Sequence, residues 1–333
     1  MFPRIPENQD ALGGYFGLEA GRREHVAFHP GATAFQSGRA AFLAVLEARR
    51  PKRIHLPWYL CDSMDEPLRQ CGIEAQRYGI DQDFRIAQPL ALEPDDWLLY
   101  VNYFGLCDAA VDELLVRHPA NQVVVDNSQA FFSFPKHSVA TLYSPRKFFG
   151  VPDGGYLVAP TTRLQFFERD TESVHRSCHL MTRLSLGAEA GYLQYTDAEH
   201  SLSDQPARRM SKVTEQLLSA IDYADVRERR RRNFDLLQSH LGPCNELKWN
   251  LREDQVPLCY PFLVRCEGLR EALIRARVYV PRYWPDLLAS EASLPERERR
   301  LAADLLPLPI DQRCEPEALM RYVVSPLLTA IRR

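Results

Sequence analysis

The sequence predicts an α/β protein in which helices cover both faces of a mostly parallel sheet, followed by a smaller C-terminal α+β domain. Short apolar runs alternate with helical patterns from about residue 37 to 160. Several of these runs, such as "WLLYVNYFG", are apolar throughout, as expected of strands that are buried on both faces. The 333 residues are also enough for one large domain and one smaller domain.

The elements of the first 160 residues follow one another in a regular order. "SGRAAFLAVLEARR", at residues 37–50, has the apolar spacing of a helix and follows a glycine turn. The other expected helices cover 62–72 and 109–119, and the expected strands cover 53–57, 73–79, 97–105, 122–126, 139–144 and 154–160. Strands that alternate with helices at this spacing predict a mostly parallel sheet.

After residue 160 the pattern becomes mainly helical. Residues 162–195 are amphipathic with helical spacing, and residues 210–241 have the pattern of one long helix that a Gly-Pro pair ends. The remaining chain alternates strand and helix over about 90 residues. We therefore expect a large domain at 1–240, which includes the N-terminal arm and the long helix, and a small α+β domain at 241–333.

Composition argues against several classes of protein. The 41 basic and 44 acidic residues give a formal charge of -3, so no overall field favours nucleic acid or an anionic membrane. The basic run "RERRRRNF" at 227–234 is expected on a solvated or interface face of the long helix, with a phosphate-rich partner as the alternative. The eight cysteines have no CxxC pair and no zinc-site spacing, so we expect free thiols and no metal site. Neither a signal sequence nor a membrane-spanning run is found, and we expect a cytoplasmic protein.

Three sets of residues that follow strand-like runs can carry chemistry, since ligands of parallel sheets bind at the carboxyl ends of the strands. Ser37, Gly38 and Arg39 in "FQSGRAAF" lie at a helix N-terminus, which can bind a phosphate or be an ordinary N-cap. Asp126 ends the apolar strand of "QVVVDNSQAFF", where it can meet a cation or cap the next turn. Lys147 in "YSPRKFFGVPDGG" can be a partly desolvated nucleophile or a solvated surface lysine.

Each set alone has an ordinary structural explanation, but the three sets together have a common one. Pyridoxal 5'-phosphate requires a phosphate cup, a carboxylate at its pyridine nitrogen and a lysine amine. The sequence supplies these groups in that order along one predicted sheet. The pattern therefore predicts a pyridoxal phosphate site.

The chain resembles the DegT/DnrJ/EryC1/StrS family of pyridoxal-phosphate-dependent sugar aminotransferases, most of which act on nucleotide sugars. The most specific segments are "VVVDNSQA" and "SPRKFFGVPDGG". The supporting segments are "GGYFGLE", "FQSGRAAF", "LPWYLCDSMDEPLRQCG", "YVNYFGLCDAAVDELL" and "RRMSKVTEQLLSAID", in the family's order. The resemblance covers most of residues 10–240. It implies the pyridoxal-phosphate transferase fold type I, with a seven-stranded-type sheet, and a homodimer with shared active sites.

The resemblance also implies roles for individual residues. Lys147 would form the internal aldimine and shuttle the proton, and Asp126 would pair with the pyridine nitrogen. Gln129 would contact the phenolic oxygen of the cofactor ring. The Ser-Gly-Arg group at 37–39 would hold the phosphate.

The chain departs from the family's pattern within the cofactor site. Cys61 stands where many relatives have an aromatic residue that stacks on the ring, which leaves Tyr59 or Trp58 for that role. Leu142 replaces the usual phosphate-binding serine, and Ser144 is the nearest substitute. These changes leave the predicted cofactor chemistry intact but weaken the assignment of the substrate.

Other departures concern the substrate side. The asparagine that the partner subunit usually sends to the phosphate corresponds to Ala207, with Arg208 and Arg209 beside it. The candidates for substrate contacts are Tyr15 in "GGYFGLE", Arg209, and Arg282, which follows an expected strand in "YVPRYWPDLL". For Arg282 and its aromatic neighbours the alternative is packing at a domain joint, and Tyr15 can equally be a packed side chain.

The resemblance implies an aminotransferase that moves an amino group, from glutamate by analogy, to a keto-sugar carried on a nucleotide. A lysine at position 147 favours transamination, because relatives with histidine there perform dehydration. Two alternatives stay open: an enzyme of the same fold that acts on a non-sugar ketone or an amino acid, and a catalytically degenerate homodimeric scaffold. Neither nucleic acid nor a membrane is expected as a partner.

Overall fold

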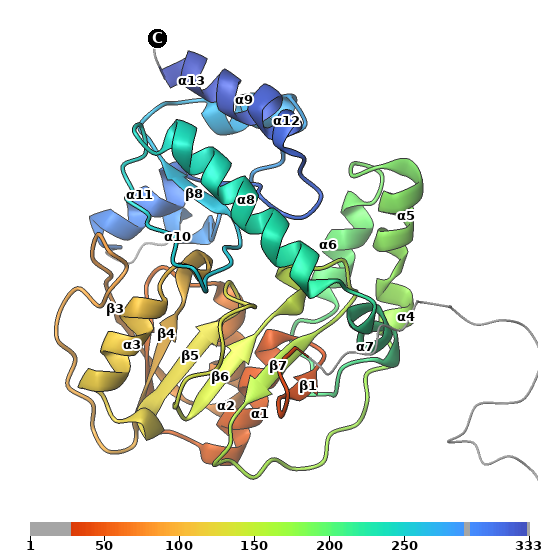
Figure 1. Ribbon diagram of the computed structural model, residues 1–333. Coiled ribbons are helices and arrows are strands. Elements are labelled where there is room, and N and C mark those ends of the chain that lie inside the picture. The colour runs from red at the N-terminus through yellow and green to blue at the C-terminus, as the bar shows by residue number, and fades with distance from the viewer. Residues whose placement is uncertain (1–27, 290–293, 332–333) are drawn as a thin grey trace, which may run out of the picture.

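A computed structural model describes residues 28–289 and 294–331, and a seven-stranded sheet lies at the centre of the larger part (Figure 1). The strands are β1 (Thr33–Phe35), β2 (Arg53–Pro57), β3 (Glu74–Tyr78), β4 (Asp96–Val101), β5 (Val123–Asn127), β6 (Ala140–Tyr143) and β7 (Gly155–Val158). Their order across the sheet is β1-β7-β6-β5-β4-β2-β3. Neighbours from β3 to β6 run parallel, whereas β7 is antiparallel to both β6 and β1. The predicted mostly parallel sheet is therefore confirmed.

Helices cover both faces of this sheet, as predicted. The helices that connect its strands are α1 (Gly38–Arg49), α2 (Asp65–Cys71) and α3 (Asp108–Arg117). α1 and α2 lie on one face, and α3 lies on the other (Figure 1). Every residue of β4 and β5 is buried, so their apolar runs fill a core on both sides of the sheet. Each buried aliphatic side chain in such a core contributes about 1.5–3 kcal/mol to stability.

The region after residue 160 is less helical than predicted. Its helices are α4 (Ser173–Arg176), α5 (Cys178–Leu186), α6 (Tyr192–His200), α7 (Lys212–Ser219) and α8 (Tyr223–Leu241). Residues 162–172 are not helical, which corrects the expectation for 162–195. The reason is tertiary: the carbonyl of Glu168 and the amide of Asp170 hydrogen-bond to the backbone of Arg209 instead of closing a helical turn.

The single long helix expected at 210–241 is also wrong, because the chain leaves the helical path between α7 and α8. Asp222 begins α8 as its N-cap, and its side chain accepts a hydrogen bond from the Asp225 amide at 3.1 Å. α8 then runs from the side of the large sheet up to the C-terminal part of the chain (Figure 1).

The C-terminal part has the predicted α+β arrangement. Its antiparallel strands are β8 (Tyr260–Leu263) and β9 (Leu305–Leu308), and its helices are α9 (Leu269–Arg275), α10 (Asp286–Ala289), α11 (Glu296–Asp304), α12 (Pro316–Leu319), the π-helical turn η5 (Met320–Val324) and α13 (Ser325–Ile331). The strand expected just before Arg282 does not form. The carbonyls of Val280 and Pro281 accept hydrogen bonds from the Arg270 guanidinium instead of pairing in a sheet.

Two large apolar clusters are found, and α8 packs into the smaller of them. The larger core surrounds the seven-stranded sheet, and the smaller core lies between α8, β8, β9 and the C-terminal helices. Phe234 and Leu237 attach α8 to the smaller core. Within residues 28–289 and 294–331, no helix is long and apolar enough to cross a membrane.

Candidate active site

Asp126 lies near the carboxyl end of β5, in the middle of the sheet between β4 and β6. The residue is 4% exposed, and its Oδ1 accepts a hydrogen bond from the Ser128 amide at 2.8 Å. Its Oδ2 has no donor among the residues that the structure describes. One oxygen thus caps the next turn, while the other remains available to pair with a cation.

Lys147 follows β6 and ends the short 3-10 helix η4 (Pro145–Lys147). Pro145 before it is buried, and Phe148 and Phe149 after it pack into an apolar cluster. Lys147 itself is exposed, and its ammonium has no hydrogen-bond or ion-pair partner in the described part of the chain. Packing therefore fixes the loop, while the amine stays free to react.

The N-terminus of α1 lies against the ends of β5 and β6. A Cβ placed on Gly38 would be 3.6 Å from Ser128 Oγ and 3.9 Å from Ser144 Cβ. Ser37 is the N-cap of α1, since its Oγ accepts a hydrogen bond from the Ala40 amide at 3.1 Å. The first two amides of α1 have no acceptor among the described residues, so they can bind a phosphate at the positive end of the helix.

The side chain of Arg39 is engaged away from this anion site. Its Nη1 donates to Glu66 Oε2 at 2.8 Å and to Ser203 Oγ at 2.7 Å. The Glu66 carboxylate is nearly buried, so this ion pair is costly to break. Arg39 can therefore offer its backbone amide to a phosphate, but its guanidinium is already satisfied.

The Gly154-Gly155 pair allows β7 to approach the same helix N-terminus. The Gly154 amide donates to the Gln36 carbonyl at 2.6 Å. A Cβ placed on Gly155 would lie 2.2 Å from the carbonyl carbon and oxygen of Ser37, which is closer than van der Waals contact permits. Any other residue at position 155 would displace β7 or the start of α1. The glycine pair that follows the lysine loop is thus required by the helix N-terminus.

Gln129 is buried in the turn after β5 and is held by the loop after β4. Its Oε1 accepts a hydrogen bond from the Phe104 amide at 2.8 Å. Phe104 lies in η2 (Tyr103–Gly105) with a φ of 57°, a left-handed conformation that aromatic residues rarely adopt. The Nε2 group of Gln129 has no acceptor among the described residues, so it can donate a hydrogen bond to a ligand.

The residues considered for ring stacking differ in accessibility. Tyr59 is fully buried, and its ring packs edge-on against Trp284 with 4.2 Å between the ring centroids. Burial raises the pKa of the Tyr59 phenol, and its hydroxyl has no hydrogen-bond partner in the described chain. Cys61 and Trp58 are partly exposed. The packing of Tyr59 therefore argues against its predicted contact with a cofactor and leaves Trp58 and Cys61 as the candidates.

Two serines flank the proposed phosphate position. Leu142 is fully buried in β6, so it cannot replace a phosphate-binding serine. Ser144, the predicted substitute, lies close to Gly38, and so does Ser128, which the sequence analysis missed. The signal for Ser128 was a hydroxyl two residues after Asp126, in the turn at the end of β5.

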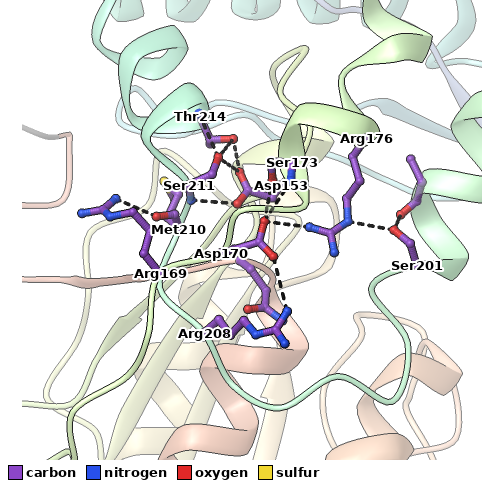
Figure 2. Close-up of polar contacts among 12 residues, drawn as sticks. Asp153, Arg169, Asp170, Ser173, Arg176, Ser201, Arg208, Met210, Ser211 and Thr214 are labelled. Atoms are coloured by element: carbon purple, nitrogen blue, oxygen red, sulfur yellow. Dashed lines mark hydrogen bonds and ion pairs between the residues drawn. The ribbon is translucent and has the colours of Figure 1, made fainter. Parts of the chain in front are cut away.

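A buried carboxylate ties the lysine loop to the segment that precedes α7 (Figure 2). Asp153 is fully buried and accepts hydrogen bonds from the Ser211 amide at 2.9 Å and the Ser211 hydroxyl at 3.0 Å. It also accepts a hydrogen bond from the Thr214 hydroxyl. Burial raises the pKa of the Asp153 carboxyl, and the hydrogen bonds from Thr214 and Ser211 offset this only in part.

A second buried carboxylate holds the other side of this segment (Figure 2). Oδ2 of Asp170 accepts a hydrogen bond from Arg176 Nη1 at 2.8 Å, and its Oδ1 lies 3.9 Å from Arg208 Nη1. The next side chain, Arg209, is exposed and forms no hydrogen bond or ion pair with the described residues. Its backbone is bridged to Phe35 of β1. Arg209 thus presents a free guanidinium on a fixed backbone.

The remaining predicted substrate residues are less informative. Arg282 is exposed on the C-terminal part and has no hydrogen-bond or ion-pair partner where the structure describes the chain. Its neighbours Tyr283 and Trp284 pack against Phe104 and Tyr59, with 6.3 and 4.2 Å between ring centroids. These contacts agree with aromatic packing at a domain joint. Tyr15 lies outside the described residues.

Comparisons with known proteins identify structural relatives but no relative by sequence. No protein-family model and no curated protein matches the chain. The putative sugar aminotransferase Spr1654 from Streptococcus pneumoniae, in its PMP form, matches with 13% identity and a TM-score of 0.63 over 92% of this chain and 89% of its own. DesI, solved in the presence of its TDP-sugar product, matches with 19% identity and a TM-score of 0.62 over 92% of this chain and 82% of its own.

A third structure is a DegT DnrJ EryC1 StrS aminotransferase from Brucella abortus. It matches with 14% identity and a TM-score of 0.60, over 90% of this chain and 86% of its own. At such identities the similarity establishes the fold. The chain therefore has the fold of the pyridoxal-phosphate-dependent sugar aminotransferases, fold type I, as the sequence predicts.

Proposed function

We propose that this protein is a pyridoxal-phosphate-dependent aminotransferase of the DegT/DnrJ/EryC1/StrS family. The observation that carries the proposal is the convergence of three groups at one end of the sheet: the partner-free amine of Lys147, the free Oδ2 of Asp126 and the open amides at the start of α1. These groups fit the amine, the carboxylate and the anion site that pyridoxal phosphate needs. The fold supports the same cofactor, since structural relatives were solved in a PMP form or with a ketimine intermediate.

The role of each residue follows from its chemistry. The Lys147 amine would hold the cofactor covalently and, once released, would act as general base and acid. Oδ2 of Asp126 would keep the ring nitrogen protonated, because a nearby carboxylate favours the charged form. Nε2 of Gln129 would donate to the phenolic oxygen. When bound, pyridoxal phosphate would supply the electron sink for amino-group transfer.

The phosphate would lie at the N-terminus of α1. The amides of Gly38 and Arg39 would donate to it, with the hydroxyls of Ser128 and Ser144 beside them. Ser37 would keep its role as N-cap and so hold these amides in place. The guanidinium of Arg39 would not take part, because Glu66 and Ser203 bind it.

For the substrates we propose glutamate as the amino donor and a nucleotide-linked keto-sugar as the acceptor. Arg209 and Arg282 support substrates that carry carboxylate or phosphate groups, since both guanidinium groups are exposed and lack partners among the described residues. The structural relatives support a sugar acceptor, since one of them, CalS13 from Micromonospora echinospora, is a sugar aminotransferase and DesI was solved in the presence of its TDP-sugar product.

We further propose a homodimer in which the α5–α6 hairpin is covered by the second copy. The hairpin projects from one side of the molecule above α4 (Figure 1). It exposes large apolar side chains, among them Leu184 at 84% and Leu193 at 76%. It contacts the lysine loop, because Glu199 of α6 pairs with Arg146. A partner on this apolar face would therefore lie next to the active site.

The proposal also includes the domain division and the cellular location. The division into a large domain at 1–240 and a small domain at 241–333 is supported by a separate apolar core, in which α8 packs against β8, β9 and the C-terminal helices. A cytoplasmic location is supported by the cysteines, since all eight are free thiols.

The test compares the purified protein with its Lys147→Ala variant. Wild type incubated with pyridoxal phosphate should develop the visible absorption band of the covalently bound cofactor, and Lys147→Ala should not. Lys52→Ala is the matched control, because Lys52 is an exposed lysine that precedes β2, at the opposite end of the strands. A colourless wild type that takes up no pyridoxal phosphate would refute the proposal and leave the scaffold alternative.

The second half of the test concerns the reaction. Glutamate should convert the visible band to that of the pyridoxamine form, and the correct keto-sugar nucleotide should restore it. A band that forms but never responds to glutamate or another amino acid would contradict aminotransfer while leaving the cofactor site intact.

A further inference from the structure

The basic run at 227–234 contains one arginine that the sequence analysis placed wrongly. Arg230 was expected on a solvated or interface face of the long helix, but it is 1% exposed. Its neighbours Arg229 and Arg231 are partly exposed, and Arg229 pairs with Asp225 and Glu315 at the surface. Among the arginines of this run, Arg230 is therefore the buried one.

The Arg230 guanidinium is bound by neutral acceptors. Its Nη1 donates to the carbonyls of Pro257 and Leu258 at 3.2 and 3.0 Å, and its Nε donates to Gln312 Oε1 at 3.1 Å. Its Nη2 lies 3.5 Å from the Phe148 carbonyl, and the guanidinium carbon lies 4.7 Å from the centre of the Phe148 ring. No carboxylate of the described chain pairs directly with Arg230.

A buried cation without a carboxylate is costly, so its contacts indicate what it stabilises. Burial lowers the pKa of Arg230 to about 10, which still leaves it charged at neutral pH. Gln312 binds the same target, since its Nε2 donates to the Phe148 carbonyl at 2.9 Å. Donors from α8 and from the segment after β9 thus meet on the carbonyl of Phe148, the residue that follows Lys147.

The same arginine is connected to the opposite side of the candidate site. The Leu258 carbonyl accepts from Arg230, and the Leu258 amide donates to the Phe104 carbonyl at 2.8 Å. The Phe104 amide in turn holds Oε1 of Gln129. Arg230 therefore connects the lysine loop with the loop that orients Gln129.

We propose that Arg230 and Gln312 are positioning residues: they fix the Phe148 carbonyl and, through it, the direction of the Lys147 side chain. We call Arg230 and Gln312, with the Phe148 carbonyl that they bind, the clamp. Because its donors come from α8 and the C-terminal part, the clamp also makes the lysine loop sensitive to the placement of the small domain. This inference rests on the proposed function, because that function is what makes Lys147 the reactive lysine.

The variants are Gln312→Leu, Arg230→Lys and Arg230→Met, with Arg231→Met as the matched control. Arg231 is the next residue of α8, and it also donates to backbone carbonyls, those of Arg252 and Gln255, but not to the lysine loop. Arg230→Lys keeps the charge but loses the fork that reaches several acceptors. Gln312→Leu is the variant least able to unfold the protein, because Gln312 is only partly buried.

The first measurement uses the cofactor-free protein. Lys147 is acetylated with limiting acetic anhydride at several pH values, and its modification is compared with that of Lys52 by peptide mass spectrometry. We expect the Lys147 to Lys52 rate ratio, or the pH at which it is half-maximal, to change in Gln312→Leu and Arg230→Lys and to stay at the wild-type value in Arg231→Met. A role limited to stability would lower the melting temperature without changing this ratio.

The second measurement is the affinity for pyridoxal phosphate, read from the visible band. Gln312→Leu and Arg230→Lys should bind about tenfold more weakly than wild type, which corresponds to about 1.4 kcal/mol. Arg230→Met should be at least as weak, and if it does not fold, the other two variants carry the test. Wild-type ratios and affinities in both folded variants would overturn the clamp. A wild type that takes up no cofactor would instead contradict the proposed function. The acetylation result would still test the clamp, because it is measured without the cofactor.

Discussion

The proposed cofactor side and the proposed substrate side of the candidate site are built differently. On the cofactor side, Asp126 and Gln129 are buried, and each has one polar atom held by a backbone amide and another left free. On the substrate side, Arg209 and Arg282 are exposed, and neither has a partner among the described residues. The buried groups of the first side are held by other parts of the same chain, whereas the second side consists of exposed cations without partners among the described residues.

This difference follows from what each side must do. Groups that act on a cofactor of fixed shape gain from rigid placement, since pre-organised donors need no rearrangement during the reaction. Groups that meet a diffusing, charged substrate remain solvated until it arrives, and the substrate or a second copy completes their contacts. Variants of the two sides should therefore fail in different ways: cofactor-side variants in turnover or stability, and substrate-side variants in substrate affinity.

The largest expected effect is that of Asp126→Asn. The amide can still accept from the Ser128 amide, so the turn after β5 should form, but the negative charge opposite the ring nitrogen is lost. Turnover of the glutamate half-reaction should fall roughly 100- to 1000-fold, equivalent to about 3–4 kcal/mol, because a buried charge pair loses one partner. Stopped-flow absorbance measures this rate. A variant that keeps more than a tenth of the wild-type rate would show that Asp126 only caps the turn.

A smaller effect concerns acid stability of the cofactor side. The His29 ring stacks on Tyr143 at the end of β6, with 3.9 Å between centroids, and its Nε2 lies 2.7 Å from the Phe131 carbonyl. Burial lowers its pKa from 6.5 to about 4, so the unfolded chain binds the extra proton first as the pH falls. The neutral ring stabilises the fold fully above pH 6.5, and this contribution is lost on going down to about pH 4. It amounts to at most about 3 kcal/mol.

Urea unfolding at several pH values checks this prediction, with His29→Gln as the comparison. Glutamine keeps a donor for the Phe131 carbonyl but does not titrate. Between pH 6.5 and 4 the free energy of unfolding should fall more steeply for wild type than for the variant. Equal slopes would mean that His29 is already accessible to protons in the folded protein.

The arrangement of the sheet edge around Asp126 could largely be predicted from the sequence, because its signals are local. Apolar runs mark buried strands, and parallel strands bring their carboxyl ends to one edge, which places Asp126 and Lys147 near the start of α1. The sequence also shows a glycine at position 155, after the loop. It does not show the close approach to Ser37 that makes this glycine necessary. Local patterns suffice here because neighbouring strands form the site.

The errors arise where distant segments decide the outcome. Tyr59 is predicted near the ring, and the local pattern gives no sign that it packs against Trp284, far along the chain. Arg230 was expected at a surface or interface because the run around it is basic, yet its acceptors lie in three other segments. Residues 162–172 have helical spacing but pair with the segment around Arg209. Periodicity reports on the faces of an element and contains no information about such partners.

The smallest expected effect is that of Arg209→Ala, which tests the substrate side. Loss of a charge-assisted contact should raise the KM of one anionic substrate about tenfold, equivalent to about 1.4 kcal/mol, with kcat nearly unchanged. Lys212→Ala is the matched control, because Lys212 is an exposed cation three residues away, and it should leave both KM values unchanged. Measuring the glutamate and the sugar-nucleotide half-reactions separately shows which anion Arg209 binds. If kcat falls instead while both KM values stay constant, Arg209 belongs to the rigid cofactor side, and the division between the two sides is wrong at this residue.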